Sequence, residues 1–293
     1  YWEMPLTLAG CAVLAVIVTL PMLRRPLTAI LPLAAIAAVG GTGYYGWKYG
    51  EFLKEDTLVQ MRNFYGALRV KQTGKDTDES TQRRLVHGVI MHGEQYVHPD
   101  RRAIITSYYG DSAGIGMAIE RIHPQNQRVG VIGLGAGTLA GYGAKGDVFK
   151  LYEINPQVLD IARRFFYYLP QSRAQIETAI GDARLVLERE SPQNFDVLAV
   201  DAFSSDAIPV HLITREALKV YLRHIKPDGA VAFHVTNRYL SLAPVVKLLA
   251  DEVGMEAVLI SDDPDDAHLS RTDWVIVTKN ADFLANEDVR AKR

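Results

Sequence analysis

The fold is decided by the segment VGVIGLGAG, residues 129–137, in which a short apolar run leads directly into three glycines at alternate positions. The run Val129–Ile132 has the length and β-branched character of a buried strand. Because glycine lacks a Cβ atom, Gly133, Gly135 and Gly137 let the backbone turn tightly and approach a ligand closely. The segment predicts the first strand and turn of a doubly wound α/β sheet, although ordinary tight turns share this glycine pattern.

An acid stands at the end of the next predicted strand, residues 148–152. Glu153 lies twenty residues after Gly133, where a carboxylate can accept hydrogen bonds from both hydroxyls of a ribose. The alternative role is to cap the following helix, but Asn155 and Pro156 already supply its cap and first-turn residue. Glu153 is therefore predicted to contact a nucleotide.

Two more acids follow predicted strands. Asp182 lies between Gly181 and Ala183, where its carboxylate can accept from an adenine amino group while the next backbone N–H donates to the ring. Asp182 can equally cap the helix that begins there. Asp201 ends a later apolar strand. Ligands of open α/β sheets collect beyond the carboxyl ends of the strands, so the three strand-end acids are expected to converge on one crevice.

The glycine spacing favours S-adenosylmethionine or a relative over a nicotinamide dinucleotide. A nicotinamide fingerprint has glycines at its first, third and sixth positions. Here the sixth position is Thr138, and the third glycine, Gly137, comes one residue early.

In these features the chain resembles the spermidine synthase family, the polyamine aminopropyltransferases, and most closely its bacterial membrane-fused branch. The resemblance covers roughly residues 83–278 and is carried by the glycine loop, Glu153-Ile154-Asn155-Pro156 with Val158, Gly181-Asp182-Ala183, the strand 196–201, His92-Gly93-Glu94-Gln95 and Thr106-Ser107-Tyr108-Tyr109-Gly110. It implies that Glu153 holds the ribose, Asp182 reads the adenine and Asp201 is the catalytic acid/base.

The chain departs from the family pattern at three places. Ala136 stands in the glycine loop where the family has an aspartate for the aminopropyl amine of decarboxylated S-adenosylmethionine. Asp206 and the later Pro209 follow Asp201 at a longer distance than in the family, and Tyr108-Tyr109-Gly110 replaces a Tyr-His-Glu-like polyamine motif. The donor site therefore carries over, whereas the identity of the amine acceptor does not.

The reaction needs few protein groups. A sulfonium donor leaves as a neutral thioether, so the protein must chiefly align a nucleophile and exclude water. An amine with a pKa near ~10.4 must first lose a proton, which Asp201 is placed to accept. Tyr108, Tyr109 and Asp206 are predicted to bind the amine, with core packing as the alternative for the tyrosines. The predicted donor site comprises Gln95, Gly133, Gly135, Gly137, Glu153, Asp182 and Ala183. For Gln95 the alternative is a residue of a turn without contact to the donor.

Other polar residues receive simpler interpretations. His87, His92 and His98 have no carboxylate partner at ligand spacing, so no metal site is expected. His211 and His234 are interpreted as structural histidines that could border the crevice. The acidic stretch 262–266 is predicted to be a solvated hairpin loop without the glycine and glutamate of a calcium loop.

Two uncharged runs at the N-terminus predict transmembrane helices. Met4–Leu23 and Pro26–Trp47 are each long enough for a hydrocarbon core of ~30 Å, and Arg24 and Arg25 separate them. A signal peptide is the alternative for the first run, but it would leave the second unexplained. Positive charge after the second run and the cytosolic supply of the donor favour a bacterial inner-membrane protein with a cytoplasmic catalytic domain. A chain that begins with Tyr1 is interpreted as part of a longer polytopic protein.

The predicted architecture has three parts: transmembrane helices over residues 1–48, a small β-rich domain over 49–102, and a Rossmann-like, methyltransferase-type catalytic domain over 103–293 whose last strand is antiparallel. The net charge of −2 argues against a nucleic-acid partner. The expected partners are a small amine, the lipid bilayer, and either a second copy or other membrane segments. Aminopropyl transfer is the favoured function, with methyl transfer from S-adenosylmethionine and a catalytically inactive cofactor-binding subunit as alternatives.

Overall fold

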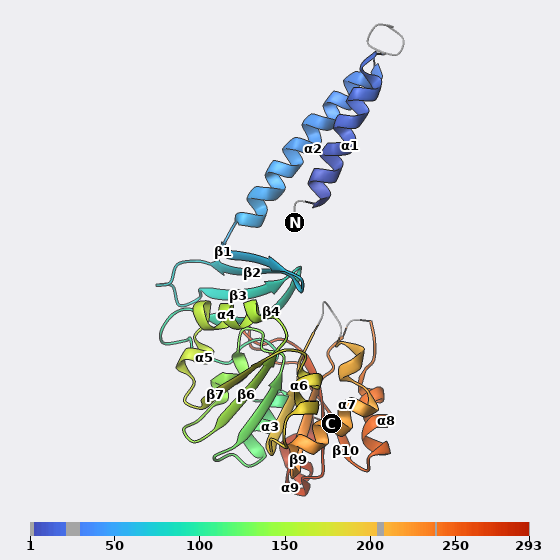
Figure 1. Ribbon diagram of the computed structural model, residues 1–293. Coiled ribbons are helices and arrows are strands. Elements are labelled where there is room, and N and C mark those ends of the chain that lie inside the picture. The colour runs from blue at the N-terminus through green and yellow to red at the C-terminus, as the bar shows by residue number, and fades with distance from the viewer. Residues whose placement is uncertain (1–2, 22–29, 204–207, 238, 293) are drawn as a thin grey trace. The chain divides into compact units, whose positions relative to one another are not determined.

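The computed structural model describes residues 3–21, 30–203, 208–237 and 239–292, and it divides into two compact units, residues 1–57 and 58–293 (Figure 1). The first unit contains two helices that pack side by side, α1 (Glu3–Thr19) and α2 (Ile30–Lys54). The second unit contains two β-sheets and the helices that cover the larger one.

The two N-terminal helices form close to the predicted runs, but the prediction that they cross a membrane is not supported. Within the described ranges, no helix combines the length and the apolar character that a membrane crossing requires. α1 has 17 residues, fewer than the about 20 that span a hydrocarbon core. α2 has 25 residues, but glycines and tyrosines dilute its apolar character and Lys48, Glu51 and Lys54 charge its last turns. Arg24 and Arg25 lie outside the described residues.

The smaller sheet of the second unit is a four-stranded meander. Its strands are β1 (Thr57–Asn63), β2 (Gly66–Thr73), β3 (Gln82–His87) and β4 (Ile90–Tyr96), in the order β1-β2-β3-β4. The β2–β3 and β3–β4 pairs are antiparallel. Several hydrogen bonds join this sheet to the larger domain, among them those from Asn63 Nδ2 to Asn155 Oδ1 (2.7 Å), from Arg83 Nη1 to the Phe165 carbonyl (2.6 Å) and from the Ala136 N–H to the His92 carbonyl (3.2 Å). The four strands lie within the stretch predicted to be β-rich, residues 49–102, and next to the glycine loop, but the start of that stretch belongs to α2, which runs to Lys54.

The larger sheet has seven strands in the order β10-β11-β9-β8-β5-β6-β7. The strands are β5 (Arg128–Ile132), β6 (Val148–Glu153), β7 (Gln175–Ile180), β8 (Phe195–Val200), β9 (Ile225–His234), β10 (Glu256–Asp262) and β11 (Thr272–Thr278). β5 to β9 run parallel, while β11 pairs antiparallel with both β9 and β10. This is the predicted methyltransferase-like sheet with an antiparallel strand near its end.

Helices cover both faces of this sheet (Figure 1). They are α3 (Gly114–Arg121), α4 (Pro156–Phe165), α5 (Tyr168–Gln171), α6 (Ala183–Arg189), α7 (Arg215–His224), α8 (Ala243–Glu252), α9 (Ala281–Ala285) and α10 (Glu287–Ala291), with 3₁₀ helices η2 (Thr138–Tyr142) and η3 (Val210–Leu212). Alternate residues of β8 belong to two separate buried clusters: Val197 and Ala199 to one, Leu198 and Val200 to the other. A core on each face explains why this strand reads as a continuous apolar run.

Three local predictions from the sequence are corrected. The first turn of a doubly wound sheet is expected to lead into a helix, but the glycine loop leads only into the short helix η2, because residues 138–147 include Gly141, Gly143 and Gly146 and glycine weakens helices. Residues 226–229, Lys-Pro-Asp-Gly, have the composition that predicts a turn, but they lie within β9, where a change of register accommodates them. Asp262 is not solvated: it is buried, accepts a hydrogen bond from Ser112 and pairs with Lys292.

Candidate active site

A cavity of about 380 Å³ lies at the carboxyl ends of the parallel strands and is bordered by residues of β2, β3 and β4. Most of the predicted site residues line it, namely Tyr108, Tyr109, Gly133, Gly135, Glu153, Asp182, Ala183 and Asp201. The predicted convergence of the three strand-end acids on one crevice is therefore what the structure shows.

The glycine loop has the backbone conformation that only glycine adopts easily. Gly133, Gly135 and Gly137 have φ of 94°, 53° and 85°. A Cβ atom on Gly133 would lie 2.5 Å from the Asp201 carbonyl oxygen, and one on Gly135 would lie 2.5 Å from the His92 carbonyl oxygen. The loop thus needs glycine partly because it passes close to the backbone of two other cavity segments. Gly137 does not border the 380 Å³ cavity, since its neighbour is Leu169.

Glu153 is fixed by the backbone that surrounds it. Its Oε2 accepts a hydrogen bond from the Leu134 N–H (3.0 Å), and its Oε1 accepts one from the Asn155 N–H (2.8 Å). Burial raises the pKa of this carboxyl, while the backbone hydrogen bonds oppose the rise. Asn155 caps α4 by accepting from the Gln157 N–H (3.1 Å), as predicted, so Glu153 is not needed as the helix cap. One carboxylate therefore ties the glycine loop to the end of β6 and faces the cavity.

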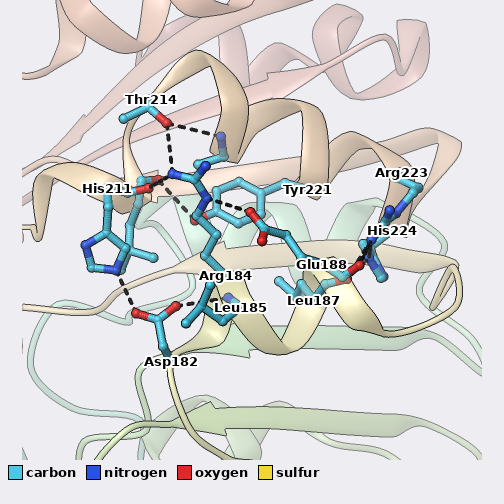
Figure 2. Close-up of polar contacts among 12 residues, drawn as sticks. Asp182, Arg184, Leu185, Leu187, Glu188, His211, Thr214, Tyr221, Arg223 and His224 are labelled. Atoms are coloured by element: carbon cyan, nitrogen blue, oxygen red, sulfur yellow. Dashed lines mark hydrogen bonds and ion pairs between the residues drawn. The ribbon is translucent and has the colours of Figure 1, made fainter.

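Asp182 has two partners, which Figure 2 shows. Its Oδ1 caps α6 by accepting from the Leu185 N–H (3.0 Å), and its Oδ2 lies 2.8 Å from His211 Nε2. Arg184 donates to the His211 carbonyl (3.0 Å), which attaches the segment of His211 to α6. The alternative role of Asp182 as a helix cap is therefore present, and it leaves the carboxylate on the wall of the cavity beside His211.

Asp201 lies between two hydrogen-bond donors at the end of β8. The Tyr109 hydroxyl donates to its Oδ2 (2.5 Å), and His234 Nδ1 lies 2.6 Å from its Oδ1. The side chain of Asp201 is 7% exposed, and the residue borders the cavity. A buried carboxylate held in this way has a defined orientation and retains lone pairs that can accept a proton from a molecule in the cavity.

Sequence reasoning gave no catalytic role to His234, which the structure places in direct contact with Asp201. The sequence offered one signal, the position of His234 at the end of a strand. The pairing of that strand, β9, with β8 brings the two side chains to the same edge of the sheet, and only the structure shows it. His211 was likewise interpreted as structural, and the structure places it on Asp182.

The two predicted tyrosines line the cavity and also pack against the core. The Tyr108 hydroxyl donates to the Met91 carbonyl (2.7 Å), and the rings of Tyr108 and Tyr109 lie edge to face with centroids 5.0 Å apart. Burial, and then the charge of Asp201, raise the pKa of both hydroxyls above the usual value of 10.0. Both hydroxyls are therefore neutral donors at neutral pH.

His92 stands over the glycine loop and was not predicted as a site residue. It borders the cavity, and among the described residues its Nε2 has no hydrogen-bond partner. Burial, and then the nearby His87, lower its pKa from 6.5 to about 4, against the opposing charge of Asp201. The imidazole is therefore neutral at neutral pH.

Two predicted site residues are placed elsewhere. Gln95 is buried outside the cavity lining, where its amide donates to the Arg102 carbonyl (2.7 Å) and accepts from the Tyr167 N–H (2.7 Å). These bonds are those of a residue that holds two loops together. Asp206 lies outside the described residues.

Comparison with curated proteins gives partial sequence matches, and no family model matches the chain. The chain is 37% identical over 116 residues to the polyamine aminopropyltransferase of Vibrio vulnificus, a match that covers 37% of this chain and 38% of that protein. It is 34% identical over 109 residues to the N-terminal histidine N-methyltransferase of Emericella nidulans, covering 36% of this chain and 19% of that protein. The chain thus spans well under half the length of these two relatives.

Solved structures match over a larger part of the chain. A spermidine synthase from Thermotoga maritima is 17% identical in sequence. The match covers 81% of this chain and 79% of that protein, with a TM-score of 0.52. A probable spermidine synthase from Corynebacterium glutamicum is also 17% identical. That match covers 80% of this chain and 84% of the other protein, with a TM-score of 0.57. These matches show a shared fold, and together with the sequence match they confirm the predicted resemblance to the spermidine synthase family.

Proposed function

From the similarity of this chain to the spermidine synthases, we propose that it is a spermidine synthase-like transferase that moves an aminopropyl group from decarboxylated S-adenosylmethionine to an amine. The observation that carries the proposal is the buried Asp201 carboxylate, held between Tyr109 and His234 on the cavity that Glu153 and Asp182 also line.

The donor would be held at the strand-end acids and the glycine loop. Glu153 has the acceptor oxygens that the two ribose hydroxyls need, and its position is fixed by two backbone N–H groups. Asp182, beside Ala183 at the start of α6, would accept from the adenine amino group. The glycine loop adds a close backbone approach without Cβ atoms. The residues present therefore suit an adenosine-containing sulfonium.

The transfer needs one bond formed, one broken and one proton moved. The lone pair of the acceptor amine attacks the propyl carbon next to sulfur, and the C–S bond breaks with its electron pair going to sulfur. The sulfonium becomes neutral methylthioadenosine, and the acceptor nitrogen takes over the positive charge as an ammonium. Before the attack, the Asp201 carboxylate attracts the protonated amine into the cavity and accepts the one proton that the amine must lose to free its lone pair. The faces of the Tyr108 and Tyr109 rings, which attract cations, would line its path.

Product analysis tests the proposal. The purified chain is incubated with decarboxylated S-adenosylmethionine and a panel of primary amines, and methylthioadenosine is measured by chromatography. We expect release that depends on both the donor and an amine. A chain that binds the donor and releases nothing with any amine would refute the transfer and favour an inactive cofactor-binding subunit.

Methyl transfer is the second candidate because of one residue. Ala136 occupies the loop position at which the family has an aspartate for the aminopropyl amine, and its N–H bonds to the His92 carbonyl. Without that carboxylate the loop does not select the decarboxylated donor by charge. With S-adenosylmethionine as donor, release of S-adenosylhomocysteine would identify methyl transfer.

Self-association and cellular location stay predictions. Gel filtration would test the first, and cell fractionation would test the second.

A further inference from the structure

His234 connects the proposed base to a second layer of side chains. Its Nδ1 lies 2.6 Å from Asp201 Oδ1, while its Nε2 lies 2.9 Å from Thr236 Oγ1 and 3.1 Å from Thr272 Oγ1. The side chain of His234 is 5% exposed. Both ring nitrogens of a buried imidazole are therefore hydrogen-bonded, one of them to the carboxylate.

The partners determine the direction of each bond. An ionised carboxylate can only accept, so His234 Nδ1 donates to Asp201. Threonine hydroxyls can donate or accept, so Nε2 has a partner whether the ring is neutral or protonated. The Tyr109 hydroxyl donates to the other oxygen of Asp201 at 2.5 Å. Each carboxylate oxygen thus receives one donor from a different direction, which prevents rotation about the terminal bond of the side chain.

The imidazole itself is held by packing. His234 and Trp274 are cross-strand partners in the antiparallel pair of β9 and β11, and their rings stack with centroids 4.5 Å apart and planes 7° apart. Phe203 packs against the same imidazole edge to face at 5.0 Å. A ring fixed by stacking and by hydrogen bonds at both nitrogens is a rigid support for the carboxylate.

We infer that His234 is a positioning residue that holds Asp201 in the orientation in which it accepts the proton of the attacking amine. This inference rests on the transfer proposed above and adds a residue to it. His234 acts through Asp201 and touches no reacting atom, so its removal should slow the transfer step without weakening donor binding.

Two substitutions separate the hydrogen bond from the packing. His234→Phe keeps an aromatic ring against Trp274 but removes both nitrogens, and we expect it to lower kcat by about 10- to 100-fold, part of what a general base contributes. His234→Asn places an amide N–H near the position of Nδ1, and we expect it to retain kcat within about fivefold of the unmodified chain. Calorimetry should give a donor Kd within about threefold for both variants. If His234→Phe does not fold, as judged by circular dichroism, His234→Leu takes its place.

The control is a second histidine–aspartate pair, at the start of β8, the strand that ends just before Asp201. His123 Nδ1 lies 2.7 Å from Oδ1 of Asp196, which is buried within β8. His123→Phe should leave kcat unchanged.

A second test combines His234→Phe with Asp201→Asn. If His234 acts only through Asp201, the double variant should be no slower than Asp201→Asn alone.

Three results would overturn the inference: an unchanged kcat in His234→Phe, a parallel loss of donor affinity, or an additive loss in the double variant. A chain without turnover would overturn the transfer and this inference together. Turnover that His234→Phe leaves unchanged would overturn the inference alone.

Discussion

Asp201→Asn tests the proposed base with little disturbance of its surroundings. The amide has one acceptor oxygen and one donor nitrogen where the carboxylate has two acceptors. The structure accommodates this change, because the Tyr109 hydroxyl can also accept and His234 can carry its proton on Nε2, where Thr236 and Thr272 can accept it. The hydrogen bonds can therefore be kept while the proton acceptor is lost.

The expected effect is large on turnover and small on stability. General-base catalysis contributes about 10²- to 10⁴-fold, so kcat should fall by that factor, or about 3–5 kcal/mol in the barrier. KM for the amine should rise as well, because a negative charge is removed from the cavity. The free energy of unfolding should change by about 1 kcal/mol or less, since the hydrogen bonds are preserved and a buried charge is removed.

The assay measures methylthioadenosine release, donor binding by calorimetry and urea unfolding on the same preparations. Asp196→Asn is the matched control, because Asp196 is also buried, within β8, but besides His123 it accepts from the Arg128 N–H and from Lys226, and neither of these two donors can become an acceptor. It should lower stability by about 1–3 kcal/mol and leave the turnover of the folded protein intact. An unchanged kcat in Asp201→Asn would remove this residue from the mechanism.

Three further substitutions test separate parts of the site. Tyr109→Phe removes one donor from Asp201 and should lower kcat about tenfold, since a hydrogen bond to a charged group contributes about 1.5 kcal/mol; unchanged steady-state kinetics would contradict the role of the hydroxyl. Glu153→Gln should raise the donor Kd by about 10- to 100-fold in calorimetry, because the charge and one acceptor oxygen are lost; equal affinity would place the ribose elsewhere. The His92 pKa of about 4 means that the unfolded chain binds a proton between about pH 6.5 and 4 that the folded chain resists, so stability falls as the pH is lowered through this range. At about 1.4 kcal/mol per pH unit, the loss is limited to about 3 kcal/mol, and urea unfolding should show a smaller pH dependence in His92→Gln.

The parts of the fold that follow a local pattern could be predicted from the sequence. The apolar runs before Glu153 and Asp201 become strands β6 and β8 of one parallel sheet, on either side of β5, because each run is short, rich in apolar residues and bounded by polar residues. Asn155 caps its helix as its residue type predicts. The helix that usually follows the first strand of such a sheet is here only a 3₁₀ turn, because Gly141 and its neighbouring glycines have a low helical propensity.

The contacts within the site were harder to predict, since they depend on strand order. The sequence indicated that Asp201 ends a strand, but it could not show that β9 would pair with β8 and bring His234 against it. The same reason applies to Gln95, which a motif assigned to the donor and the structure places between the backbones of Arg102 and Tyr167. Asp262 appeared solvated because its neighbours are acidic, but Lys292, distant in sequence, pairs with it.

The membrane prediction is not supported, because it depended on a finer distinction. Both N-terminal runs lack charges over about the length of a span, and both form helices, so the pattern predicted secondary structure correctly. The absence of charge is a weaker condition than an apolar helix of sufficient length, because Gly, Thr and Tyr are uncharged without being strongly apolar. α2 includes Gly40, Gly41 and Thr42 before its tyrosines, and α1 ends at Thr19, before the first run does. Counting charges is therefore a weaker criterion for a membrane span than the apolar length of a helix, whereas the strand-end acids follow from the ends of predicted strands, which the fold brings to one cavity.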